Sequence, residues 1–186
     1  MKHWKNYITL LIAAALITAC SPHKKLASAK NKNNTSPESP ANNTTSSTGI
    51  QTKYSALLDV KKTEIQNISL YALIDEWYGT AYKYGGCDKN GIDCSNFAAI
   101  LYQEIYRKKI QGSSASIFNQ CHPISKEELQ EGDLVFFKIN SHTISHIGVY
   151  LQNNRFIHAT TQKGVMINDL NEPYYLKHFY KAGRLK

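Results

Sequence analysis

The sequence lacks an apolar run that is long enough to form a lasting transmembrane helix. Its longest such run, residues 8–17, has ten residues, whereas a helix that crosses a bilayer needs about 20. The sequence also lacks a stripe of basic residues interleaved with aromatic ones. The net charge is +8, but residues 1–50 supply +5 of it and the remainder only +3. These absences argue against a membrane span and against nucleic-acid binding.

Cysteine is scarce, and the usual metal-ligand spacing is absent. The four cysteines, at positions 20, 87, 94 and 121, include no Cys-x₂₋₄-Cys pair, which is the common spacing in zinc sites. A zinc site formed by Cys94, Cys121 and nearby histidines is an alternative that no such spacing supports. We therefore expect neither a metal nor another cofactor.

The first 20 residues combine a positive start, a short apolar run and a cysteine. Lys2 and Lys5 precede the run, an arrangement typical of a signal peptide. The run ends in Leu16-Ile17-Thr18-Ala19-Cys20, which resembles the lipobox of bacterial lipoproteins. The resemblance implies cleavage before Cys20 and acylation of Cys20, and several acyl chains would anchor the protein firmly. The alternative is an ordinary secretory peptide with an incidental cysteine.

Residues 21–49 contain almost no large apolar side chain. Such a segment cannot bury enough surface to offset the entropy that it would lose on ordering. We predict a flexible tether with a typical reach of ~30 Å, and we expect folded sequence to begin near Tyr54. The predicted organisation is thus a signal peptide at 1–19, the lipidated Cys20 with its tether at 20–53, and a folded domain at 54–186. No acidic run follows Cys20, so nothing suggests export to the cell surface. We expect a membrane-anchored lipoprotein of the bacterial cell envelope, in the outer membrane and facing the periplasm.

Helical periodicity precedes strand periodicity in the folded part. The apolar spacing predicts helices over residues 69–77 and from residue 94 to about 109–112. Short helical turns are expected over 113–124, followed by a capping-box pattern at 125–128. Strands are predicted over 134–139, 145–151, 156–160, 165–169 and 180–185. Helices followed by about five antiparallel strands indicate an α+β fold, with the helices packed on one side of the sheet.

The stretch Gly91-Ile92-Asp93-Cys94-Ser95-Asn96-Phe97 places a cysteine at a predicted helix start. Asp93 is a good N-cap, so Cys94 would lie in the first turn, where free backbone N–H groups and the helix dipole favour a negative charge. A thiol there is expected to lose its proton more easily, and the thiolate is the nucleophilic form. The alternative is that Cys94 is a small buried residue at the start of a core helix.

Two histidines, His146 and His158, lie on predicted neighbouring strands that flank a turn near Asn153-Asn154. With a tight two-residue turn, residue 158 would oppose 149, and His146 would point to the other face. An odd-length connection or a bulge makes 158 oppose 148, and the two histidines then become diagonal neighbours on one face. We predict this second arrangement. His142, in a polar loop, is interpreted as a surface residue.

Five sequence blocks occur in an order that is specific to one family. They are Trp77-x-Gly79-Thr80-x-Tyr82-x-Tyr84-Gly85-Gly86, Gly91-Ile92-Asp93-Cys94-Ser95-x-Phe97, Gly132-Asp133-Leu134-Val135-Phe136-Phe137, His146-Ile147-Gly148-Val149-Tyr150 and Phe156-Ile157-His158-Ala159. Together they resemble the NlpC-type papain-like cell-wall endopeptidases, from about Tyr54 to the C-terminus. The resemblance implies a papain-like α+β fold and a thiol-protease triad.

The resemblance also implies a role for each site residue. Cys94 is the nucleophile, His146 the base and His158 the residue that orients the base, while Tyr82 helps to shape the oxyanion site. Two residues that flank the nucleophile, Asp93 and Ser95, can help to hold the peptide substrate. Asn96 departs from the family pattern, which usually has Gly there, and this puts the details of substrate binding in doubt.

The implied activity is hydrolysis of peptide bonds in peptidoglycan, in stem peptides or in cross-links, by a monomer attached to the membrane through the lipid on Cys20. Two alternatives stay open: amidase or acyltransferase chemistry by the same triad, and a non-catalytic envelope-binding lipoprotein. Cys87 and Cys121 could form a disulfide, as exported proteins often do. We favour free thiols, because the family fold does not require a bridge there.

Overall fold

The computed structural model describes residues 46–186. The predicted signal peptide, Cys20 and most of the predicted tether lie outside the described residues. Within residues 46–186, no helix has the length and apolar character needed to cross a membrane.

Helices fill the first half of the described chain and strands most of the second. The helical elements are α1 (Ser47–Leu58), η1 (Lys62–Glu64), α2 (Ile68–Trp77), α3 (Cys94–Leu101), the π-helical turn η2 (Tyr102–Tyr106), α4 (Ser114–Phe118), η3 (Lys126–Glu128) and α5 (Pro173–His178). The strands are β1 (Cys87–Asp88), β2 (Gly91–Ile92), β3 (Cys121–Ile124), β4 (Leu134–Phe137), β5 (His146–Tyr150), β6 (Arg155–Thr160), β7 (Gly164–Asp169) and β8 (Phe179–Leu185). The predicted α+β class is confirmed.

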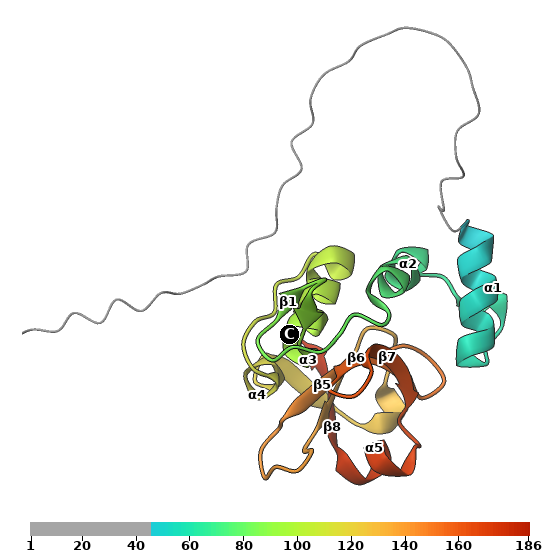
Figure 1. Cartoon of the computed structure of the whole chain (residues 1–186). Coiled ribbons are helices and arrows are strands. Elements are labelled where there is room, and N and C mark those ends of the chain that lie inside the picture. The colour runs from blue at the N-terminus through green and yellow to red at the C-terminus, as the bar shows by residue number, and fades with distance from the viewer. Residues whose placement is uncertain (1–45) are drawn as a thin grey trace, which may run out of the picture. The chain divides into compact units, whose positions relative to one another are not determined.

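One antiparallel sheet forms the centre of the fold, with the strand order β3-β8-β4-β5-β6-β7. It has six strands rather than about five, because residues 121–124 form an edge strand where we expected helical turns. β3 pairs only with β8. Pro123 is compatible with this position, since an edge strand leaves one side without ladder bonds. Figure 1 shows α2 and α3 on one side of the strands and α5 on the other.

Two helices were not predicted, and the helix that begins at Cys94 ends with the π-helical turn at Tyr106 and not near residues 109–112. The first of the two unpredicted helices is α1, which Ser46 caps by accepting a hydrogen bond from the Gly49 amide, so residues 47–53 are helical where we expected a tether. The buried residues Ile50, Tyr54 and Leu58 recur every four positions and hold α1 against the domain. The polar composition of α1 concealed this pattern. The second helix, α5, was missed because it is short; it has a proline in its first turn.

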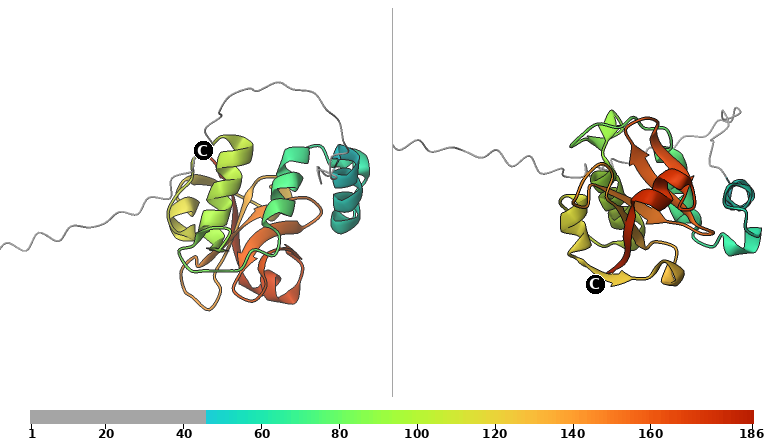
Figure 2. Two further views of the ribbon diagram at one scale, coloured as in Figure 1. Left: turned by 45° about the horizontal axis from the view of Figure 1, so that its top comes forward. Right: turned by 90° about the horizontal axis from the view of Figure 1, so that it is seen from below.

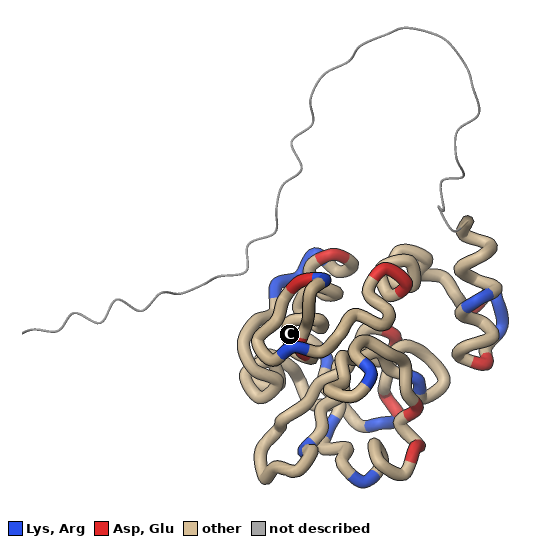
Figure 3. Tube along the Cα trace, in the orientation of Figure 1, with Lys and Arg blue, Asp and Glu red and all other residues tan. Residues whose placement is uncertain are grey.

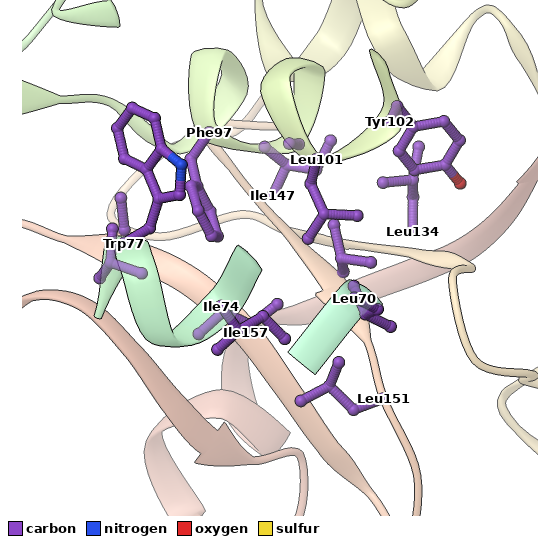
Figure 4. Close-up of a cluster of buried hydrophobic side chains, with 14 of the residues drawn as sticks. Leu70, Ile74, Trp77, Phe97, Leu101, Tyr102, Leu134, Ile147, Leu151 and Ile157 are labelled. Atoms are coloured by element: carbon purple, nitrogen blue, oxygen red, sulfur yellow. The ribbon is translucent and has the colours of Figure 1, made fainter. Parts of the chain in front are cut away.

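The sheet has an apolar cluster on each face. On the side of α2 and α3, a large cluster includes Trp77, Phe97, Leu101 and Ile147 (Figure 4). On the other side, a smaller cluster contains Val135, Phe137, Phe156, Leu170 and Tyr175. Successive residues of β4 belong to different clusters, because neighbouring side chains of a strand point to opposite faces of the sheet. The larger cluster fixes α3 against β5.

Two more figures show how α5 lies relative to the sheet and where the charged residues are along the chain. Two further orientations show α5 packed beneath the strands (Figure 2). Along the Cα trace of the described residues, basic and acidic positions are interspersed (Figure 3). This distribution agrees with the modest charge excess of the sequence after residue 50.

Candidate active site

Cys94 is the first residue of α3, as predicted, and Asp93 is its N-cap. Asp93 Oδ1 accepts hydrogen bonds from the Asn96 amide at 2.8 Å and from the Ser95 hydroxyl at 2.9 Å. Asp93 Oδ2 accepts from the Gly85 amide at 3.0 Å. The buried carboxylate therefore satisfies free donors of the helix start and joins them to the preceding loop.

The Cys94 thiol is buried beside β5. Desolvation raises its pKa to about 11, although hydrogen bonds with the backbone of Ile147, Ser95 and Cys94 itself act in the opposite direction. The expectation of a lowered thiol pKa is therefore wrong for this state of the protein, since burial outweighs the helix start. Cys94 is a neutral thiol at neutral pH, and it needs a base to remove its proton. Ile147 immediately follows His146, so the nucleophile lies beside the start of β5.

The hairpin of β5 and β6 has the predicted odd-length connection. Val149 pairs with Ile157 and Tyr150 with Phe156, a register that places 158 opposite 148. Leu151 and Arg155 close the loop, because the Leu151 amide donates to the Arg155 carbonyl oxygen at 2.8 Å. Three residues, 152–154, therefore connect the strands. The prediction that His146 and His158 share a face is confirmed.

The two histidines are in direct contact. His146 Nε2 and His158 Nδ1 lie 2.6 Å apart, and His158 Nε2 lies 2.9 Å from Asn168 Oδ1. Desolvation lowers the pKa of His146 well below its ordinary value, and the neighbouring His158 lowers it further. Desolvation also lowers the pKa of His158, to about 4. Both rings are therefore neutral at neutral pH, and His146 can accept a proton.

Tyr82 lies in the loop before α3, where the sequence places it near the nucleophile. The loop is held by hydrogen bonds on both sides of Tyr82: the Ile92 amide donates to the Ala81 carbonyl oxygen at 3.0 Å, and the Lys83 amide donates to the Ile92 carbonyl oxygen at 3.1 Å. Burial raises the pKa of Tyr82, and the nearby Cys94 and Asp93 raise it further. The hydroxyl is therefore protonated at neutral pH and can donate a hydrogen bond.

Tyr82, His146 and His158 line one cleft of about 410 Å³. The other walls come from the β4–β5 connection, the β6–β7 hairpin and α5 with its N-cap, and include Ser145, Lys163, Asn168 and Glu172 together with Thr160, Met166, Tyr174 and Tyr175. Sequence reasoning missed Asn168 and Glu172. In the β6–β7 register, His158 opposes Met166, so Asn168 is a diagonal neighbour of His158 on the same face. The signal that the sequence offered for Asn168 was a polar residue at that position of a predicted strand.

Cys94, Asp93 and Ser95 are not among the residues that line this cleft, and neither are the other candidate residues. His142 is on the surface, as predicted. Cys121 is a buried free thiol, which excludes a Cys87–Cys121 disulfide and confirms the preference for a free thiol at that position. Over residues 46–186, the histidine, cysteine, aspartate and glutamate side chains form no group of three that could hold a metal ion.

Comparisons with known proteins agree with this geometry. Residues 79–184 match the NlpC/P60 family. The chain is 33% identical over 180 residues, 96% of its length, to an Escherichia coli K12 protein named murein DD-endopeptidase MepS/murein LD-carboxypeptidase, and covers 90% of that protein. It is 39% identical over 117 residues, 63% of its length, to a Haemophilus influenzae protein named probable endopeptidase NlpC homolog, and covers 62% of it.

A solved structure supports the same assignment. An NlpC/P60 family protein from Bacillus cereus aligns with 64% of this chain and 40% of its own length, at a TM-score of 0.58 and 27% identity. The fold and the cysteine–histidine site define a cysteine peptidase of the papain-like class. The chain belongs to the NlpC/P60 family, which confirms the resemblance found in the sequence.

Proposed function

We propose that this chain is a lipid-anchored cysteine endopeptidase that hydrolyses peptide bonds in peptidoglycan, at cross-links between stem peptides. The observation that carries the proposal is the 2.6 Å contact between His146 Nε2 and His158 Nδ1, in the strand that also contacts Cys94. A base held by a second polar ring beside a helix-start thiol is the arrangement of a thiol-protease triad. The E. coli relative named a murein DD-endopeptidase supports the choice of substrate.

In the proposed mechanism, His146 takes the thiol proton as the Cys94 sulfur attacks the peptide carbonyl carbon. Because the resting pair is neutral, the proton transfer accompanies attack instead of preceding it. The Tyr82 hydroxyl and backbone N–H groups at the start of α3 stabilise the negative charge on the carbonyl oxygen. The C–N bond then breaks, His146 returns the proton to the leaving amine, and water hydrolyses the thioester.

Digestion of purified peptidoglycan tests this activity. The full chain in detergent is compared with Cys94→Ala and with Cys121→Ala, a matched change at a second buried free cysteine, which lies on the edge strand β3. We expect the full chain and Cys121→Ala to convert cross-linked dimers to monomers with new peptide termini, identified by mass, and Cys94→Ala to produce none. Absence of products from the full chain would overturn the proposal and favour a non-catalytic binding protein. Release of peptides from sugar chains would instead indicate an amidase.

The lipid anchor is proposed from the sequence that ends at Cys20. An anchored enzyme with a polar tether would act on the peptidoglycan above its membrane. Metabolic labelling with an alkyne fatty acid should modify the chain but not Cys20→Ser, and fractionation should place the label in the outer membrane. A secreted, unlabelled chain would contradict the anchor without affecting the proposed peptidase activity.

A further inference from the structure

Two polar residues from outside the triad lie behind His158. Asn168 belongs to β7, and Glu172 is the N-cap of α5. The Asn168 Nδ2 group donates to both carboxylate oxygens of Glu172, at 3.0 and 3.1 Å. Asn168 Oδ1 lies 2.9 Å from His158 Nε2. A continuous chain of hydrogen bonds therefore runs from Glu172 through Asn168 and His158 to His146.

The carboxylate of Glu172 determines the direction of every bond in this chain. An ionised carboxylate only accepts hydrogen bonds, so the amide of Asn168 must present its NH₂ group to Glu172 and its oxygen to His158. His158 Nε2 must then carry a hydrogen and donate it to Asn168 Oδ1. In a neutral imidazole the other nitrogen is an acceptor. His158 Nδ1 therefore accepts from His146 Nε2, and His146 Nδ1 is left without a hydrogen.

We propose that Asn168 and Glu172 are positioning residues of the active site, which fix the tautomers of His158 and His146 so that His146 Nδ1 is the proton acceptor. The negative charge of Glu172 also favours the His146 imidazolium ion that forms when the Cys94 proton is transferred. No proton has to travel along the chain, since each bond only becomes more polarised as the charge develops. The inference about catalysis rests on the proposed peptidase function.

The local structure holds Glu172 in place. Its Oε1 atom also accepts a hydrogen bond from the Asp169 amide at 2.9 Å. Its carbonyl oxygen accepts from the Leu176 amide at 2.9 Å, which ties it to the first turn of α5. Asp169 in turn pairs with Arg155 on β6. The carboxylate is therefore fixed relative to both strands of the β6–β7 hairpin, and it can orient the Asn168 amide.

The tyrosine beside this chain does not replace Asn168. The Tyr175 hydroxyl lies 3.4 Å from His158 Nε2 and 3.3 Å from Asn168 Oδ1. Both distances are longer than the 2.9 Å between His158 and Asn168, so Asn168 is the closer acceptor. The Tyr175 ring packs against His158 with centroids 5.2 Å apart. Tyr175 therefore closes the apolar side of the pocket while Asn168 supplies the polar contact.

Nitrogen NMR of the histidine rings and steady-state kinetics of the full chain test the proposal. Both methods are applied to the unmodified chain, to Asn168→Leu, which removes the acceptor at similar volume, and to Glu172→Gln, which removes only the charge. Glu127→Gln serves as the matched control, because Glu127 is exposed and lies outside the cleft. Thermal unfolding verifies that each variant is folded.

At neutral pH we expect the Nε2–H tautomer for His146 and His158 in the unmodified chain and in Glu127→Gln. Asn168→Leu should give mixed tautomers and reduce kcat by about 10- to 100-fold with little change in KM, the range expected for a hydrogen bond that strengthens with charge. Glu172→Gln should reduce kcat by about threefold to tenfold.

Restoring an acceptor provides a second comparison. Asn168→Asp keeps an oxygen opposite His158 Nε2, so it should retain the Nε2–H tautomer of His158 even if activity is lower. Unchanged tautomers in Asn168→Leu would overturn the proposal whatever its activity, since a loss of activity alone would then reflect packing. If the unmodified chain hydrolyses no peptidoglycan, the tautomers still decide the inference, and only the proposed function fails.

Discussion

The side chain of Asn96 donates a hydrogen bond to the carbonyl oxygen of Gly86 at 3.0 Å and lies 3.3 Å from Asp93 Oδ2. It thereby joins the first turn of α3 to the loop that also carries Tyr82. The family usually has glycine at this position, and a glycine cannot form either contact. Asn96 thus acts on the wall of the cleft by fixing its loop, and it does not project as an obstacle beside the nucleophile.

Replacing Asn96 tests this connection. Asn96→Ala should lower the free energy of unfolding by about 1 kcal/mol through loss of the hydrogen bonds, and Asn96→Gly by about 1 kcal/mol more because glycine disfavours the helix. Both variants should lower kcat more than they raise KM, since the loop that carries Tyr82 moves and the triad does not. Urea unfolding and kinetics on soluble muropeptides measure the two effects. A rise in KM with kcat unchanged would contradict this account.

Alkylation of Cys94 should reveal a neutral thiol. Burial raises the Cys94 pKa to about 11, while that of His146 lies well below its ordinary value. Iodoacetamide should therefore modify Cys94 slowly at pH 7, and the rate should rise about tenfold per pH unit towards pH 11. The mass of the tryptic peptide spanning residues 90–107 isolates Cys94 from the other cysteines. A rate that is constant between pH 6 and 9 would instead show a resting thiolate–imidazolium pair.

The oxyanion role of Tyr82 predicts a large kinetic effect from a small change. Tyr82→Phe removes only the hydroxyl of a residue that lines the cleft. If that hydroxyl donates to the developing oxyanion, kcat should fall by about 10²- to 10³-fold with little change in KM. Tyr84→Phe is the matched control, because Tyr84 lies in the same loop but is 90% exposed. Equal effects of the two changes would argue against an oxyanion role.

The sequence supported the triad because local patterns determine it. Asp93 and the apolar spacing after it specify the start of α3, and the three-residue connection after β5 fixes which face His146 and His158 share. The position of Glu172 could not be obtained in this way. It depends on α5, a helix of six residues whose pattern is too short to detect, and on the packing of that helix against the sheet.

The Cys94 pKa shows a second limit of sequence reasoning. A helix start lowers a thiol pKa and can be recognised from an N-cap residue, whereas burial raises it and depends on every element that covers the sulfur. Here α3 packs on β5 and the thiol is 8% exposed, so burial dominates. The same applies to α1: its buried face became recognisable only once its tertiary neighbours were known.

The histidine pair should make the protein less stable in acid. The pKa of His158 is about 4 in the folded protein and about 6.5 when the chain is unfolded. Below pH 6.5 the unfolded chain therefore binds protons that the folded protein does not, and His158 alone should cost about 3 kcal/mol by pH 4. Urea unfolding at several pH values measures this loss.

Two variants test how much of the loss of stability in acid comes from His158 and how much from other titratable groups. His158→Gln should flatten the decline in stability between pH 6.5 and 4, whereas His142→Gln should leave it unchanged because His142 is on the surface. The pKa of His146 is lowered as well, so part of the decline should persist in His158→Gln. Identical pH profiles for the two variants would contradict neutral burial of the pair.

The close approach of Gly164 to the loop before Tyr82 gives the last prediction. Gly164 begins β7 with a φ of +70°, and a Cβ atom there would lie 2.1 Å from the Thr80 carbonyl oxygen. That oxygen accepts a hydrogen bond from the Val165 amide at 2.9 Å, which docks the loop on the sheet. Gly79 also has a positive φ, of +78°, but a Cβ atom added to it would meet no other atom within 4 Å. Gly79→Ala therefore measures the backbone strain without the steric clash.

Gly79→Ala should therefore lower the free energy of unfolding by about 1–2 kcal/mol, the cost of a left-handed conformation for an L-residue. Gly164→Ala carries the same cost and must also move the Thr80 backbone, so it should lose at least about 3 kcal/mol in total. Since Thr80 lies two residues before Tyr82, Gly164→Ala should also reduce kcat/KM, and Gly79→Ala much less. Urea unfolding and peptidoglycan digestion of the two variants measure these differences. Equal losses in both assays would show that the contact between Gly164 and Thr80 does not position the cleft.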